Sequence, residues 1–163
     1  MSEVPELLER LRRGAELVAV SITGAAGSEL DFVPEPGKWS IRQIVSHLAD
    51  AEMVAGMRIR RLIAENTPRL EAYDQDAWAA NLDYTKRKTS QALETFRRTR
   101  AENYELLKDL PVETFDREGV HSERGPMSLK FLLQLMAEHA ENHAAQLRAR
   151  RGEFKAQKAA ATK

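Results

Sequence analysis

The sequence predicts an all-α fold, a four-helix bundle. Four segments carry apolar residues at intervals of three and four, the repeat of an amphipathic helix, and no segment shows a convincing strand pattern. An apolar stripe is stable only when it is buried, so four stripes favour packing against one another in a bundle. At 163 residues the chain has the length of one domain with its own hydrophobic core.

The first two helices are expected over residues 5–22 and 41–64, separated by a loop that contains two prolines and a glycine. The second helix has a well-marked start. Ser40 can cap the first backbone amides, Gln43 can complete a capping box, and Trp39 can pack against the following turn. These features predict the start of this helix to within a residue or two.

The third helix is expected over residues 86–110, ending before a proline. Residues 66–85 show no sustained period, and only a short helix over residues 75–82 is expected within them. Trp78 and Tyr84 are the aromatic residues of this stretch that we expect to dock on the bundle.

The fourth helix is expected to begin after Ser128, which can act as a cap, and to end at Gly152. The segment before it, residues 112–127, reads as a turn-rich connection. We therefore predict a single domain over residues 1–152, followed by a frayed tail over residues 153–163, which has no apolar face to bury.

The bulk composition narrows the possible functions. Lysine and arginine together number 25, as do aspartate and glutamate, so no net charge attracts the protein to nucleic acid or to an anionic membrane. The absence of cysteine excludes disulfides, thiolate metal sites and cysteine nucleophiles. The first residues are too charged for a signal peptide, and no run approaches the roughly 18 apolar residues of a membrane span. We therefore expect a cytoplasmic protein that acts on a small molecule.

Three of the four histidines have the spacing of a metal site. His139 and His143 lie one turn apart on the fourth helix, so both imidazoles project from the same face and can reach one ion. His47 lies on the second helix beside its apolar stripe. Two ligands from one helix and a third from a neighbouring helix would leave positions on the ion open for water or substrate.

Other interpretations of these histidines are weaker. Two histidines four residues apart also occur by chance in helices, and a histidine beside an apolar stripe is often a hydrogen-bonded core residue. His121 lies in a polar run without periodicity, and we interpret it as a surface residue. A carboxylate-bridged di-iron bundle is disfavoured because the paired Glu-x-x-His motifs are missing.

These motifs resemble those of the DinB/YfiT-like family of metalloenzymes, over roughly residues 5–152. The family pattern is a Trp-Ser helix start followed by His-Leu-x-Asp, and a late helix with His-x-x-x-His-x-x-Gln. In this chain the pattern is carried by Trp39, Ser40, His47, Leu48, Asp50, His139, His143 and Gln146. The resemblance implies an up-down-down-up bundle, frequent homodimers, and a divalent metal, most often zinc or nickel, held by the three histidines.

The resemblance also implies a reaction class. Characterised members include transferases and isomerases that use low-molecular-weight thiols, and a metal with an open position can make a thiol or water nucleophilic at neutral pH. The leading hypothesis is therefore a metal-dependent transferase with a low-molecular-weight thiol as co-substrate. A metal-dependent hydrolase is one alternative, and a metal-binding or small-ligand-binding bundle without turnover is another.

Two further residues are candidates for roles near the metal. Asp50, three residues after His47, is the nearest carboxylate that could accept the second ring N–H and fix the ring orientation. Arg100 lies on the apolar stripe of the third helix, where it could bind a substrate carboxylate or extend to the surface, and we favour the surface position.

Overall fold

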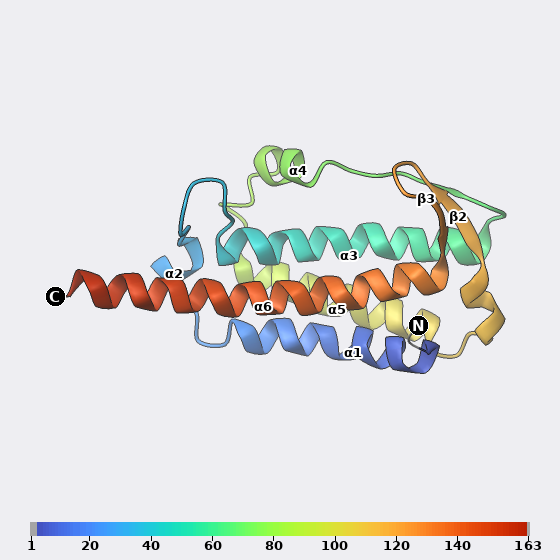
Figure 1. Cartoon of the computed structure of the whole chain (residues 1–163), viewed down its shortest axis with the longest axis horizontal. Helices are drawn as coiled ribbons and strands as arrows, with labels where there is room; N and C mark the ends of the chain where they lie inside the picture. The colour runs from blue at the N-terminus through green and yellow to red at the C-terminus, as the bar shows by residue number, and fades with distance from the viewer. Residues whose placement is uncertain (1–2, 163) are drawn as a thin grey trace.

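Four long helices lie side by side in the computed structural model, which describes residues 3–162 (Figure 1). α1 and α6 run in one direction and α3 and α5 in the other, which gives the predicted up-down-down-up order. The predicted all-α four-helix bundle is confirmed. The helices are α1 (Val4–Ser21), α3 (Ile41–Ala64), α5 (Thr89–Leu107) and α6 (Leu129–Ala161).

The order of the helices explains the long connections. α1 packs on α5 and α6, and α3 packs on the same two helices. Because α3 and α5 are consecutive, adjacent and parallel, the chain must return along the length of the bundle between them. This return carries β1 (Arg69–Leu70) and the short helix α4 (Gln75–Asn81), close to the helix expected over residues 75–82. None of the helices within residues 3–162 has the length and apolar character needed to cross a bilayer.

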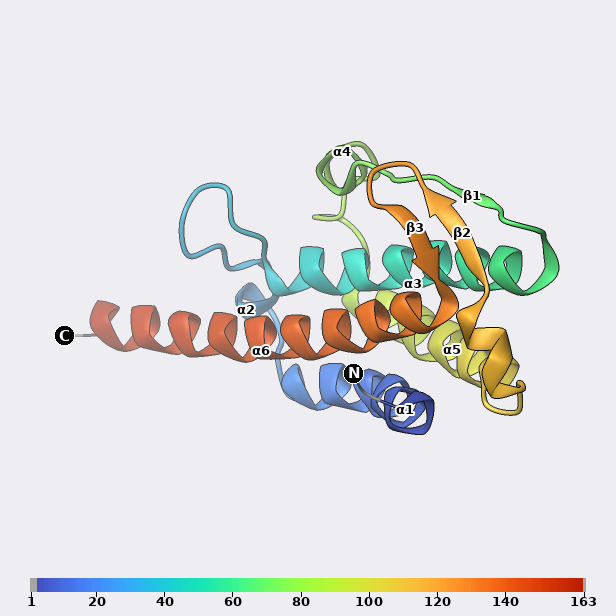
Figure 2. The same ribbon diagram turned by 45° about the vertical axis from the view of Figure 1, so that its right-hand side comes forward.

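A small sheet covers part of one side of the bundle (Figure 2). It contains β1, β2 (Glu118–His121) and β3 (Gly125–Ser128), with β1 parallel to β2 and β2 antiparallel to β3. We expected no strands, and this expectation is wrong. Strands of two to four residues are too short to show the alternation by which a sequence reveals a strand. The remaining elements are α2 (Ser28–Asp31) and a 3-10 helix (Val112–Asp116).

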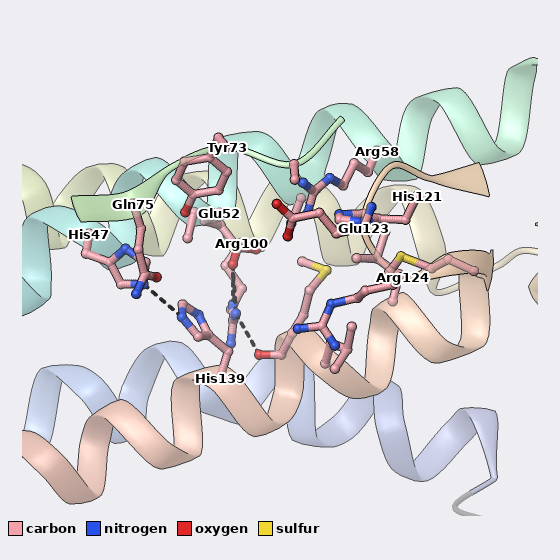
Figure 3. Close-up of a pocket in the computed structure, with 17 residues that line it drawn as sticks. His47, Glu52, Arg58, Tyr73, Gln75, Arg100, His121, Glu123, Arg124 and His139 are labelled. Atoms are coloured by element: carbon pink, nitrogen blue, oxygen red, sulfur yellow. Dashed lines mark hydrogen bonds and ion pairs between the residues drawn. The ribbon is translucent and has the colours of Figure 1, made fainter. Parts of the chain in front are cut away.

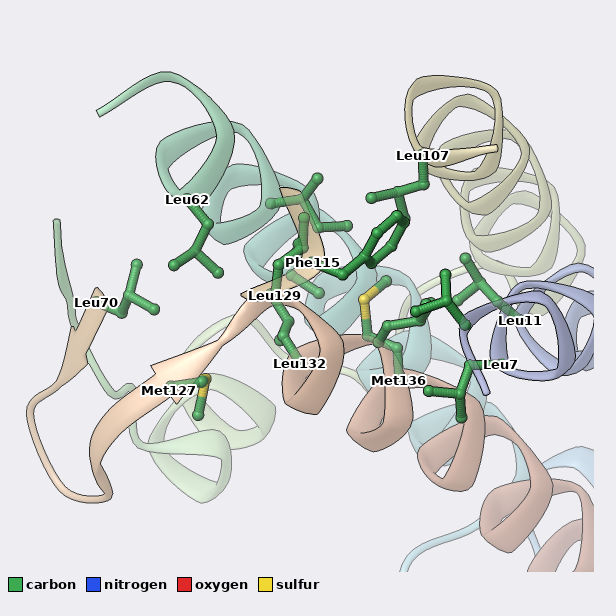
Figure 4. Close-up of a cluster of buried hydrophobic side chains, with 14 residues drawn as sticks. Leu7, Leu11, Leu62, Leu70, Leu107, Phe115, Met127, Leu129, Leu132 and Met136 are labelled. Atoms are coloured by element: carbon green, nitrogen blue, oxygen red, sulfur yellow. The ribbon is translucent and has the colours of Figure 1, made fainter. Parts of the chain in front are cut away.

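Two clusters of buried apolar side chains form the core, one toward each end of α3. The cluster at the C-terminal end of α3 is shown in Figure 4 and includes Leu7, Leu11, Leu62, Leu107, Phe115 and Leu133. The cluster at the N-terminal end includes Val18, Ile44, Leu48, Phe96 and Leu147. Both are built mainly from the apolar stripes of the four long helices, and the first also includes Leu70 of β1, Phe115 of the 3-10 segment and Met127 of β3.

The predicted start of α3 is confirmed. The Ser40 hydroxyl accepts a hydrogen bond from the Gln43 amide at 3.3 Å, and the Gln43 side-chain oxygen accepts one from the Ser40 amide at 3.0 Å. Trp39 packs on the cluster that contains Ile44, as a hydrophobic staple does. At the start of α6, Ser128 caps the amide of Phe131 at 3.1 Å, as its position predicts.

The end of α6 differs from the expectation. Gly152 does not end the helix, and residues 153–161 of the predicted tail are helical rather than frayed; residue 163 lies outside the described residues. The first added turn is held by contacts with the loop region near α2. The ring of Phe154 packs on Phe32 with centroids 5.5 Å apart, and Arg151 is paired with Glu29 at 2.7 Å. These contacts are long-range in the sequence, so local signals could not predict them.

Candidate metal centre

The three predicted metal ligands come together in the bundle. His47 comes from the second turn of α3, and His139 and His143 come from the middle of α6, which packs against α3. Nε2 of His139 lies 2.9 Å from Nε2 of His47 and 3.1 Å from Nε2 of His143. Figure 3 shows the rings of His47 and His139 directed toward one another.

This spacing fits a common ion. Nitrogen ligands about 2.1 Å from one ion lie about 3.0 Å apart at a right angle and about 3.4 Å apart at a tetrahedral angle. The three candidate ligand atoms all lie within 4.8 Å of one another. Small side-chain rotations are therefore sufficient to bind an ion, and the helices need not move.

The hydrogen bonds of the rings also favour a cation. The side-chain oxygen of Gln146 lies 2.7 Å from Nδ1 of His143 and accepts its proton, so Nε2 of His143 presents a lone pair to the cluster. Nε2 of His139 carries at most one proton, which can hydrogen-bond to His47 or to His143 but not to both. Nδ1 of His47 is buried without a hydrogen-bond partner. A cation that accepts all three Nε2 lone pairs removes this conflict.

Burial keeps the three rings in the form that binds metal. Loss of solvation lowers the pKa of His47 to about 4 and that of His139 to about 3. The pKa of His143 is also lowered by burial, although its bond to Gln146 opposes the shift. The rings are therefore neutral at pH 7, and no proton must be displaced when a metal binds.

The role predicted for Asp50 is corrected by the structure. Its two carboxylate oxygens accept hydrogen bonds from the hydroxyl of Tyr84 and from Nη1 of Arg87, each at 2.6 Å, and neither is bonded to His47. Both donors lie in the segment between α4 and α5, so Asp50 attaches this segment to α3. Tyr84 is buried, as expected, and burial together with the bond to Asp50 raises its pKa. The negative charge of Asp50 still raises the pKa of His47, against the larger effect of burial.

We expected Arg100 to extend to the surface, and this expectation is wrong. Its side chain is 1% exposed, and its guanidinium is paired with the buried carboxylate of Glu52 at 2.7 Å. It also donates to the backbone oxygen of Met136 at 3.1 Å and lies 4.7 Å above the ring of Phe96. Glu52 already neutralises the charge of Arg100, and only Nη1, which is buried without a hydrogen-bond partner, is left to serve its alternative role as a substrate-anion site.

A cavity of about 410 Å³ begins at His47 and His139, and a second of about 220 Å³ lies beside His47 and His143. The walls of the larger cavity come from α3, α6, residues 72–75 and the β2–β3 hairpin (Figure 3). His121, which we expected at the surface, is 5% exposed and lines this cavity. The pairing of β2 with β1 places it there, which its polar surroundings in the sequence did not indicate.

Fold and site together define a class: a four-helix bundle with a three-histidine cluster between two of its helices, suited to a divalent metal. The chain belongs to the DinB superfamily, whose family model matches residues 7–147. The resemblance inferred from the tryptophan–serine helix start and the histidine motifs is therefore confirmed.

Similar proteins support this assignment. A Bacillus subtilis protein, YfiT, named as a proposed metal-dependent hydrolase, is 30% identical over 121 residues, which cover 74% of this chain and 68% of YfiT. An Oceanobacillus iheyensis protein with the same kind of name is 26% identical over 144 residues, covering 88% of this chain and 83% of the relative. The structure of YfiT matches 93% of this chain and 90% of its own, with a TM-score of 0.84 and 26% identity. YfiT is described there as "a probable metal-dependent hydrolase with an unusual four-helix bundle topology".

Proposed function

We propose that this protein is a divalent-metal-dependent enzyme that activates a nucleophile at the three-histidine centre and acts on a small molecule in the adjoining cavity. The observation that carries the proposal is the convergence of three neutral imidazoles, two of which, those of His47 and His139, lie at one end of a cavity of about 410 Å³. Hydrolysis is the first candidate reaction, because the relatives are named as hydrolases.

The residues of the chain have separable roles in this proposal. His47, His139 and His143 hold the ion, which acts as a Lewis acid and makes water or a thiol nucleophilic at neutral pH. Gln146 fixes the proton of His143 on the ring nitrogen that faces away from the ion. Apolar side chains from α3 and α6, among them Ala55 and Met136, line the cavity and limit the water that can compete with a substrate.

Transfer of a low-molecular-weight thiol is the second candidate reaction, and one feature of the site favours it. The histidines lie between two separate cavities, of about 410 and 220 Å³, so a thiol and an electrophile can approach the centre from different sides. Zinc and nickel both suit a site with three imidazole ligands and remain the proposed metals. A homodimer, a location in the cytoplasm, and binding without turnover also remain proposals.

Elemental analysis tests the metal centre. Protein purified without a histidine tag is expected to carry close to one equivalent of zinc or nickel, and His47→Ala and His143→Ala are each expected to lose it. His121→Ala is the matched control, because His121 lines the same cavity without joining the cluster, and it should keep the metal. Equal metal content in all four proteins would overturn the proposed centre.

Activity assays then separate the two reactions. The metal-loaded protein is incubated with a panel of small carboxylic esters and with an activated aromatic halide, in the presence and absence of added thiol. Ester cleavage without thiol supports hydrolysis, whereas loss of halide only when thiol is present supports transfer. Absence of both reactions in fully loaded protein would favour a binding protein without turnover.

A further inference from the structure

The outer end of the cavity beside the histidines carries an unusual arrangement of charge. The lining of the whole cavity contains three arginines and two glutamates. Arg100 and Glu52 neutralise one another in their buried ion pair. Figure 3 shows the other charged side chains together, at the end of the cavity away from His47 and His139. This end is bounded by Arg58, His121, Glu123 and Arg124.

The two arginines at this end have no carboxylate partner. Among the ion pairs formed by residues 3–162, none includes Arg58 or Arg124, and Glu123 is also unpaired. Arg58 is held in place by a hydrogen bond from Nη2 to the backbone oxygen of Glu71 at 2.5 Å. Its Nε is buried and has no partner, so an oriented N–H donor is left over. Such a donor costs free energy until an acceptor binds it.

The electrostatic surroundings of Arg58 also favour an anion at this end of the cavity. Burial and the nearby positive charge of Arg124 both lower the pKa of Arg58. Burial lowers the pKa of His121, and the charges of Arg58 and Arg124 lower it further, so this histidine is neutral at pH 7. An anion placed between the two guanidiniums relieves their mutual repulsion. Before an anion binds, Arg58, Arg124 and Glu123 together carry one excess positive charge. This charge matches a single carboxylate better than a dianionic phosphate.

We propose that Arg58 and Arg124 form a subsite for the carboxylate of a small substrate or co-substrate, whose reacting group lies at the histidine end of the same cavity. This inference rests on the proposed function and adds the substrate class: a monoanionic molecule with its carboxylate and its reactive ester or thiol at opposite ends. The guanidiniums bind and orient the substrate and take no part in bond cleavage.

A series of mercapto-carboxylic acids tests the subsite. Each acid, from 3-mercaptopropionate to 6-mercaptohexanoate, is compared with the mercapto-alcohol of the same length. The protein is loaded with cobalt, so that thiol binding is followed by its absorption band. We expect the acid that spans the cavity to bind at least about tenfold more tightly than its alcohol, as a charge-assisted contact predicts.

The variants separate the subsite from the metal centre. Arg58→Gln and Arg124→Gln should each reduce the preference for the acid and leave binding of the alcohol unchanged. Arg124 is exposed, so its replacement leaves the fold intact even if Arg58→Gln perturbs it. Arg98→Gln is the matched control, because this exposed arginine on α5 is paired with Glu94 outside the cavity, and it should behave as the unmodified chain.

Failure of the subsite and failure of the metal centre give different results. Equal binding of acids and alcohols by the cobalt protein, or an acid preference that survives both cavity variants, overturns the subsite and leaves the metal centre standing. If no cobalt binds, the proposed metal centre is refuted. Calorimetry of the metal-free chain with the same acids then tests whether the carboxylate subsite exists. A binding heat specific to the acids and lost in Arg124→Gln supports it, and no acid-specific heat refutes it.

Discussion

At the scale of single residues, the metal centre depends on which nitrogen of each ring carries the proton. Gln146 accepts the proton of His143 Nδ1 and so commits Nε2 to the cluster. His47 has no such partner, since its Nδ1 is buried and unpaired. Gln146 therefore orients His143, and Gln146 is the side chain to test.

Replacing Gln146 by alanine should weaken metal binding without abolishing it. Loss of a hydrogen-bond partner of a ligating histidine typically lowers metal affinity by about 10- to 100-fold. Competition with a chromogenic chelator measures the affinity. Gln134→Ala is the control, because Gln134 lies on the same helix but bonds Glu138 instead of a histidine. An affinity unchanged by Gln146→Ala would show that His143 needs no orienting partner.

The metal-free chain should lose stability as the pH falls from about 6.5 toward 4. The folded state keeps His47 and His139 neutral, with pKa values of about 4 and 3, whereas the unfolded chain is protonated near the ordinary value of 6.5. The unfolded state binds more protons in this interval, so the free energy of unfolding is complete above pH 6.5 and decreases below it. Each histidine contributes up to about 1.4 kcal/mol per pH unit.

Urea denaturation of chelator-treated protein at pH 7.0, 6.0 and 5.0 measures this dependence. His139→Gln carries no group that titrates in this range, so its free energy of unfolding should decrease less steeply. Identical slopes for the two proteins would contradict the neutral state of His139.

At the scale of elements, the cap of α3 stabilises the helix that carries His47. Ser40→Ala removes the hydroxyl that accepts from the Gln43 amide, and we expect a loss of about 1 kcal/mol in the free energy of unfolding. Denaturant titration of the metal-free protein measures it. Ser90→Ala replaces an exposed serine in the first turn of α5 that caps no backbone amide, and it should change stability by less than about 0.5 kcal/mol. An equal effect of the two substitutions would show that the cap contributes nothing specific.

Two helical glycines should respond to alanine in opposite ways. A Cβ at Gly14 would lie 2.4 Å from Nη1 of Arg100 and 2.9 Å from Cβ of Ala140, so α1 and α6 would have to separate. We expect Gly14→Ala to destabilise the protein by about 1–2 kcal/mol, because overpacking outweighs the gain in helix propensity. A Cβ at Gly152 would meet no atom within 4 Å.

Gly152→Ala should therefore stabilise α6 by up to about 1 kcal/mol. Thermal unfolding of both variants beside the parent chain provides the comparison. If both substitutions stabilise the protein, the close contact of α1 with Arg100 and α6 is not maintained in solution.

At the scale of the whole molecule, a buried polar network separates the two halves of the core. Glu52 of α3 accepts from Arg100 and Asn103 of α5, and Arg100 also donates to the Met136 carbonyl of α6. Three of the four long helices are thus joined at one level of the bundle. We expect this ion pair to favour one alignment of the helices, because neither charge can be left without its partner.

Removing one member of this pair should destabilise the protein strongly. Arg100→Met leaves the Glu52 carboxylate buried without its cation, and we expect a cost of about 3–5 kcal/mol. The double variant Glu52→Gln, Arg100→Met removes both charges and should recover a large part of this loss. Denaturant titrations of the two single variants and the double variant give the coupling. Additive losses would contradict a direct interaction between the two charges.

The sequence by itself determined the four long helices, the caps at Ser40 and Ser128, and the three histidines of the cluster. The helices, the caps and the pair His139 and His143 depend on residues within a few turns of one another, and the helical repeat makes them visible in the order of the amino acids. His47 lies 92 residues before His139, and it was expected from its place beside the apolar stripe of its own helix and from the family motif. Only the tertiary structure decided the partners of Asp50 and Arg100, the burial of His121 and the path of the chain beyond Gly152. Each of these depends on a contact between segments far apart in the sequence, such as Arg100 with Glu52 or β2 with β1, and no local pattern encodes such a contact.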